Sequence, residues 1–149
     1  MAEPNPAVFF EVFTEIGIIE QLSRALLEAQ LPAGLIAPHF TVLNHLTRVA
    51  DGRTPMEMAR AFQIPKTSMT HTLKVLEAQG LVETRANPED GRSKRVWLTD
   101  EGRDVRAQTI ASLAPVMAEL AAGFDIERLL EIKPVLTDLR VFMDAARDP

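Results

Sequence analysis

Hydroxyl, imidazole and basic side chains gather between positions 66 and 74 of this chain. Hydroxyl and imidazole groups can exchange hydrogen bonds with base edges in the major groove of DNA, and lysine can pair with phosphate. On a helix they would mostly share one side, opposite an apolar side formed by Met69, Leu73 and Leu76. We therefore expect a helix whose polar side contacts DNA. Its residues are Lys66, Thr67, Thr70, His71 and Lys74.

A second basic cluster follows in a predicted hairpin. Residues 81–85 and 94–98 have the composition of short strands, and residues 86–93 between them are dense in turn formers. The tip of such a hairpin can place Arg92 and Lys94 in the minor groove or on the DNA backbone.

The order of elements from 54 to 98 predicts how these residues are positioned. Thr54, Pro55 and Glu57 form a helix start with a capping box, and this helix is short because Gln63-Ile64-Pro65 interrupts it. A second helix spans 66–79 and ends at Gly80, and the hairpin follows. A short helix, a turn, a polar second helix and a hairpin together predict a helix-turn-helix with a wing, which binds double-stranded DNA.

One alternative is a winged module that contacts protein and not DNA. A DNA binder should retain a random duplex at low salt and release it steeply as the salt concentration rises. The formal net charge of -5 argues mildly for the alternative. However, residues 60–95 contain seven basic and four acidic residues, which leaves three positive charges in excess. The local field of such a segment steers binding more than the net charge does, although a solvated charged surface would have the same composition.

Long apolar helices are predicted on both sides of the winged segment. Residues 7–30 carry apolar side chains at three- and four-residue steps, and so do residues 126–146. A helix over residues 38–50 precedes the winged segment, and one over 100–122, capped by Thr99 and kinked at Pro115, follows it; Pro134 is expected to kink the last helix. These stripes are too wide for one winged domain to cover, which predicts a homodimer.

Other functional classes lack support in the sequence. The chain has no cysteine, which removes disulfides, thiolate zinc sites and cysteine nucleophiles. His39 and His45 lie on different sides of a helix without a nearby acid, so we expect no metal site, and no motif predicts an enzyme or a cofactor. No apolar run is long enough to span a bilayer and no signal peptide is evident, so we expect a cytoplasmic protein that binds no membrane.

Three segments resemble the MarR (multiple antibiotic resistance regulator) family. Residues 90–102, DGRSKRVWLTDEG, are similar to its wing signature DxRxxxxxLTxxG. Residues 64–71, IPKTSMTH, and 76–82, LEAQGLV, resemble its recognition helix and the exit into the wing. The resemblance implies a mainly α fold in a single domain over 1–149, with a winged helix-turn-helix at about 37–102 and dimerisation helices at about 7–36 and 103–146.

The resemblance also implies a function. Family members are dimeric repressors or activators whose DNA binding is often relieved by a small anionic aromatic ligand. Of the two we expect a repressor that such a ligand releases, and the two-fold symmetry of a dimer predicts a pseudo-palindromic operator. By position, Ser68 joins the DNA-facing residues of the polar helix, and Asp90 would hold Arg92 in place without touching DNA. This chain departs from the family at His71, where many relatives have arginine, and at Pro65, where many have a serine cap.

The region after Pro38 lies near the place where ligands of this family bind. Phe13, His39, Phe40 and Leu43 could line a pocket there, and the alternative is that the apolar residues belong to an ordinary core. Trp97 is expected to have a structural role, because a protein that binds duplex DNA meets no unstacked base.

Overall fold

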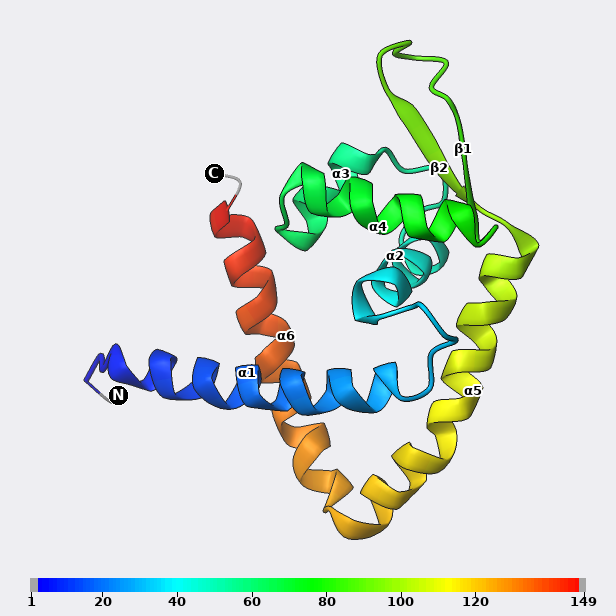
Figure 1. The fold of residues 1–149 in the computed structure, drawn as a ribbon. Coiled ribbons are helices and arrows are strands. Elements are labelled where there is room, and N and C mark those ends of the chain that lie inside the picture. Colours follow the sequence, from blue (N-terminus) through cyan, green and yellow to red (C-terminus); the bar gives the residue numbers. More distant parts are fainter. Residues whose placement is uncertain (1–2, 148–149) are drawn as a thin grey trace. The chain divides into compact units, whose positions relative to one another are not determined.

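The computed structural model describes residues 3–147, and the described part contains six helices and one antiparallel hairpin (Figure 1). In chain order the elements are α1 (Ala7–Glu28), α2 (Ala37–Arg48), α3 (Pro55–Phe62), α4 (Lys66–Ala78), β1 (Val82–Ala86), β2 (Lys94–Leu98), α5 (Asp100–Gly123) and α6 (Ile126–Arg147). The predicted mainly α fold with a small wing is confirmed. The chain forms two compact units that divide within α5, after Leu113.

The helix-turn-helix forms where the capping residues predict it. The hydroxyl oxygen of Thr54 accepts a hydrogen bond from the backbone N–H of Glu57 at 3.2 Å, and Pro55 occupies the first helical position. The Glu57 carboxylate accepts a hydrogen bond from Arg53 at 2.9 Å, which holds the pKa of Glu57 below its usual value. Gln63 ends α3 in the left-handed region with φ of 54°, and α4 begins directly after Pro65.

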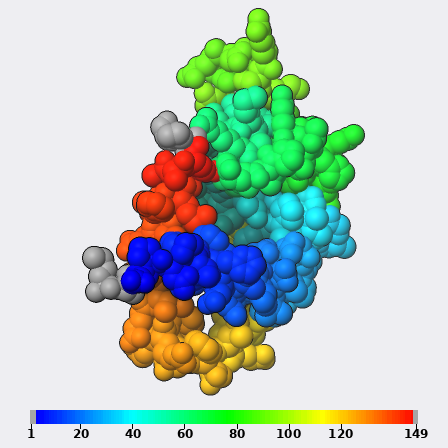
Figure 2. Space-filling view, turned by 90° about the vertical axis from the view of Figure 1, so that its left-hand side faces the viewer, coloured from blue at the N-terminus to red at the C-terminus, as the bar shows by residue number. Residues whose placement is uncertain are grey.

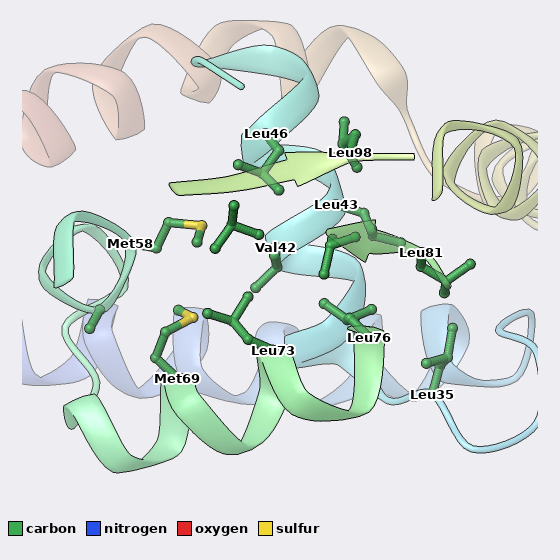
Figure 3. Close-up of a cluster of buried hydrophobic side chains, with 13 residues drawn as sticks. Leu35, Val42, Leu43, Leu46, Met58, Met69, Leu73, Leu76, Leu81 and Leu98 are labelled. Atoms are coloured by element: carbon green, nitrogen blue, oxygen red, sulfur yellow. The ribbon is translucent and has the colours of Figure 1, made fainter. Parts of the chain in front are cut away.

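The hydrophobic core of the first unit lies between α2, α4 and the hairpin (Figure 3). Met58 of α3, Met69 of α4 and Val96 of β2 are fully buried within it. Along α2, Phe40 is only partly buried and Val49 is 56% exposed, whereas Val42 is fully buried. The buried positions of α2 follow the spacing of one helical face and include one polar residue. They are His39, Val42, Leu43 and Leu46.

The two strands pair over five residues, from Val82 opposite Leu98 to Ala86 opposite Lys94. The first strand therefore begins one residue later than predicted. At its base Trp97 packs over Gly52, where an added β-carbon would lie 2.5 Å from the indole ring. The backbone of Gly52 has φ of +70°, so glycine is required there for two reasons. The guanidinium carbon of Arg85 lies 5.2 Å from the centre of the indole ring, which gives Trp97 the structural role that the sequence predicts.

The long helices leave most of their apolar side chains exposed. No residue of α1 or α6 is buried, and large side chains such as Phe10, Leu22 and Val135 are more than 60% exposed. Pro115 and Pro134 lie inside α5 and α6, which continue on both sides of them. Among residues 3–147 no single helix is long and apolar enough to cross a membrane, and α5 with α6 passes that test of length and composition only as a bent pair.

Candidate nucleic-acid interface

The outer side of α4 brings together five of the six polar residues predicted on this helix. At 100° per residue, positions 66, 67, 70, 71 and 74 fall within less than half of the helix circumference. All five side chains are exposed and line one open depression of about 380 Å³. They are Lys66, Thr67, Thr70, His71 and Lys74. This surface carries two positive charges together with hydroxyl and imidazole groups.

Ser68 does not share this surface. It is exposed at the flank of α4, where it lines a separate cavity of about 330 Å³ together with Met69 and Thr72. The remaining walls of that cavity come from α1, α2, the last residue of α3 and the turn that follows it. The helix period accounts for the separation, because position 68 lies about 100° beyond position 67 and away from Lys66.

The hydrogen bonds within α4 limit what its hydroxyls can do. The Thr70 hydroxyl donates to the carbonyl oxygen of Lys66 at 3.0 Å, within the helix. Its donor is therefore occupied, and its oxygen remains available as an acceptor. A neutral imidazole at His71 supplies one donor and one acceptor, so hydrogen bonds of both directions are available on this surface.

The wing projects beyond the helices of the first unit (Figure 2), and Asn87 organises it. The Asn87 side chain is only 8% exposed. Its Nδ2 donates to Oγ of Ser93 at 2.9 Å, and its Oδ1 accepts from the backbone N–H of Glu89 and from Nε of Arg95, both at 3.1 Å. Sequence reasoning treated Asn87 as one turn former among several. Its partners lie two to eight residues away and were not visible in the pattern.

Asp90 contacts the backbone of Arg92. Its Oδ1 accepts from the backbone N–H of Arg92 at 3.0 Å, and its carbonyl oxygen accepts from the N–H of Ser93 at 3.1 Å. Within residues 3–147 no salt bridge joins the Asp90 carboxylate to the Arg92 guanidinium. Asp90 therefore shapes the turn that carries Arg92, and whether this turn positions Arg92 on DNA stays a prediction.

Ion pairs decide which cations remain available for an anionic ligand. Arg85 pairs with Glu83, and Arg95 pairs with Glu89 at 3.2 Å. In the described part of the chain, four cations of α4 and the wing enter no salt bridge. They are Lys66, Lys74, Arg92 and Lys94. The unpaired positive charge is thus concentrated on α4 and near the tip of the wing.

Comparison with known proteins agrees with this geometry. Residues 33–93 match the model of the MarR family. The fold is similar to that of MarR from E. coli in its apo form, with 25% identity and a TM-score of 0.75 over 92% of this chain and 98% of that chain. Residues 33–93 therefore have the sequence pattern of the MarR family, and the fold is similar to that of MarR. The resemblance expected from the wing and recognition-helix segments is confirmed.

Two further solved structures have a similar fold. A mutant of E. coli MarR complexed with operator DNA is 24% identical, with a TM-score of 0.75 over 92% of this chain and 99% of that one. The PcaV transcriptional regulator from Streptomyces coelicolor, in complex with its natural ligand, is 22% identical, with a TM-score of 0.69 over 98% of this chain and 99% of that one.

The structure gives physical reasons for the end of the MarR wing motif. The hydroxyl of Thr99 donates to the carbonyl oxygen of Gly80 at 2.7 Å and accepts from the N–H of Gly102 at 3.0 Å, so it caps α5 as predicted. A β-carbon on Gly102 would lie 2.0 Å from the carbonyl oxygen of Leu81. The motif therefore requires glycine at this position so that α5 can approach the residue before β1.

Asp51 is a second residue that sequence reasoning missed, and it lies at the base of the wing. Its Oδ1 accepts from the backbone N–H of Leu98 at 3.0 Å, and its Oδ2 lies 3.2 Å from Nη2 of Arg103. Asp51 therefore joins the loop after α2 to the end of β2 and the start of α5. In the sequence it precedes a glycine and reads as a helix end, because its partners are 47 and 52 residues away.

The residues predicted to line a ligand pocket lie in different surroundings. Leu43 is fully buried in the core, Phe40 is partly buried and Phe13 is 41% exposed on α1. His39 is 5% exposed, and its Nδ1 accepts a hydrogen bond from the N–H of Ile36 at 2.8 Å. Burial lowers the pKa of His39, and nearby His71 lowers it further. None of these four residues lines the cavity beside Ser68.

Proposed function

We propose that this chain is a sequence-specific regulator of transcription that binds double-stranded DNA as a homodimer. The observation that carries the proposal is the exposed polar surface of α4, which lies in the same unit as a projecting wing with unpaired Arg92 and Lys94. Such a surface suits a major groove, and the wing suits the adjacent minor groove or backbone. In this proposal Thr67, Thr70 and His71 contact base edges, whereas Lys66 and Lys74 pair with phosphates.

The exposed apolar helices support the homodimer. Side chains on α1 and α6 remain open to solvent in a single copy, among them Phe9 at 56% and Leu130 at 56% exposure. A second copy would remove this surface from water, which is the largest favourable term in association. We assign dimerisation to about 7–36 and 103–146, and DNA binding to about 37–102. Two-fold symmetry then predicts a pseudo-palindromic operator, and repression is the simplest outcome because an occupied operator excludes other proteins.

Salt-dependent binding to a mixed-sequence duplex tests the proposal. The protein should bind the duplex at low salt, and the affinity should fall linearly with salt on a double logarithmic scale. The Lys74→Ala variant should reduce this slope by about one for each phosphate that it no longer neutralises, because it removes an unpaired cation. Arg85→Ala is the matched control, since that cation is already paired with Glu83. Absence of duplex binding at any salt concentration would favour the protein-interaction module.

We also propose that the cavity beside Ser68 admits a small aromatic effector. Its walls include the apolar side chains of Val42 and Phe62, and the ion pair of Arg24 with Glu20, at 3.3 Å, lies at its edge. Because Met69 and Ser68 belong to α4, an occupant would touch the DNA-facing helix directly. Benzoate, a simple anionic aromatic probe, should lower the affinity for duplex in the wild type and have less effect in Arg24→Gln. Equal responses of both proteins would refute this cavity as the site.

A further inference from the structure

Three cations from separate parts of the first unit converge on one groove. Lys66 begins α4, Arg92 lies in the turn of the wing and Lys94 begins β2, and all three line a groove of about 660 Å³. The start of α3, at Thr54 and Pro55, forms another wall of this groove. The positive charges assigned separately to the recognition helix and to the wing therefore share one concave surface.

An exposed methionine lies among these cations. Met56 lines the same groove and is 63% exposed, whereas Met58 and Met69 of the same unit are fully buried. A small free anion would gain little binding energy from contact with the thioether of Met56. A nucleic-acid backbone, in contrast, alternates an anionic phosphate with a sugar that presents C–H groups. The combination of three cations and one exposed apolar side chain matches that alternation.

We propose that this groove holds the sugar–phosphate strand that separates the major groove from the minor groove. Lys66 and Lys94 pair with phosphates, Arg92 adds to the positive field, and Met56 packs against a deoxyribose. The proposal rests on the proposed function. If α4 occupies the major groove and the wing tip reaches the minor groove, the intervening strand must pass between them. The groove lies between the start of α4 and the wing.

The one acid of the groove is compatible with this assignment. The Oδ1 atom of Asp90 is engaged by the backbone N–H of Arg92 at 3.0 Å. The three cations leave a surplus of positive charge within the groove. The groove should therefore attract an anionic strand, and its contacts should be independent of base sequence.

Methyl NMR of protein labelled at methionine tests the contact directly. We expect the Met56 methyl signal, assigned with Met56→Leu, to shift when a mixed-sequence duplex is added at low salt. The buried Met58 and Met69 serve as internal references. If the duplex binds, as judged by fluorescence anisotropy, and the Met56 signal does not move, the groove assignment is wrong while the proposed function survives. If the duplex does not bind, both fail.

Two pairs of variants give an independent test. Met56→Glu should lower duplex affinity at least tenfold, whereas Thr47→Glu, which adds the same charge at an exposed position of α2 outside the groove, should have a much smaller effect. An acid near the start of α3 suits the helix dipole, so Met56→Glu should stay folded. Lys66→Ala and Lys94→Ala should each reduce the salt slope by about one for each phosphate left without its cation. Equal affinities for the two glutamate variants would overturn the proposal.

Discussion

The Asn87 side chain joins the two sides of the wing, because its Nδ2 donates to Oγ of Ser93 at 2.9 Å. Its Oδ1 at the same time accepts from the backbone of Glu89 and from Arg95, so one buried amide satisfies three partners. The hairpin has no large hydrophobic residue in its turn, and these polar contacts take the place of a core. The shape of the wing therefore depends on one residue whose side-chain oxygen and nitrogen are both engaged within the wing, and this residue also lines the groove that we assign to the DNA strand.

We predict that Asn87→Ala weakens DNA binding by disordering the wing. The partners left without a hydrogen bond cost about 1–3 kcal/mol locally, while the core between α2 and α4 stays intact. The midpoint temperature of thermal unfolding should therefore change little, whereas the affinity for duplex should fall. Ser93→Ala, which removes one of the hydrogen bonds, is the matched control and should have a smaller effect. Wild-type affinity in Asn87→Ala would contradict the role of the amide in shaping the wing.

A second prediction concerns the stability of the fold in mild acid. His39 has a pKa below its usual value, because burial opposes its charge. As the pH falls, His39 of the unfolded chain therefore binds a proton before His39 of the folded chain does, starting near the ordinary pKa of about 6.5. The free energy of unfolding should be greatest above that pH and should fall as the pH drops toward the lowered pKa. Glu28, which accepts from the N–H of Ala37, and His71 on α4 are the titratable groups beside this site.

His39→Gln tests this dependence by urea unfolding at a series of pH values. Glutamine at the third helical position can still accept from the N–H of Ile36, but it does not titrate. The variant should have a shallower loss of stability between about pH 6.5 and pH 5. Some slope should remain, because the pKa of His45 is also lowered, first by burial and then by Arg53. An unchanged slope would show that His39 does not contribute.

A third prediction concerns the close approach of α5 to the residue before β1. In Gly102→Ala the new methyl group would lie 2.0 Å from the carbonyl oxygen of Leu81, which is backbone and cannot rotate away. We expect a loss of about 3 kcal/mol or more in the free energy of unfolding, as for overpacked interiors. Gly91→Ala is the control, since nothing lies within 4 Å of its added β-carbon. Equal stabilities of the two variants, measured by urea unfolding, would refute the argument.

The sequence predicted those elements whose signals are local. The Thr54 cap, the interruption of α3 before Pro65 and the polar side of α4 all depend on residues within one or two helical turns. It failed where the partners are far apart, as for Asp51 with Leu98 and Arg103, and where a polar residue occupies a core position, as His39 does. Ser68 lines a different cavity from the other polar residues of α4, and the helical angle of position 68 accounts for this. The convergence of Lys66 and Lys94 on one groove depends on tertiary packing and had no local signal.

The last prediction separates two roles for Asp90 in the wing. As a plain charge near DNA it would repel phosphate, so any variant that removes the charge should bind more tightly. As an acceptor for the N–H of Arg92, at 3.0 Å, it holds the turn that carries the guanidinium. Asp90→Asn keeps a side-chain oxygen in the same position and deletes the charge, whereas Asp90→Ala deletes both. Comparison of these two variants therefore isolates the hydrogen bond.

We expect Asp90→Ala to bind a mixed-sequence duplex more weakly than the wild type, although it removes a negative charge, and Asp90→Asn to bind at least as tightly as the wild type. Arg92→Ala should weaken binding and reduce the salt slope by about one for each phosphate that the guanidinium neutralises. In the Arg92→Ala background the Asp90→Ala change should lose most of its effect, because the turn no longer carries a cation to position. If Asp90→Ala alone binds more tightly than the wild type, the carboxylate acts only as a charge and its hydrogen bond with Arg92 does not matter for binding.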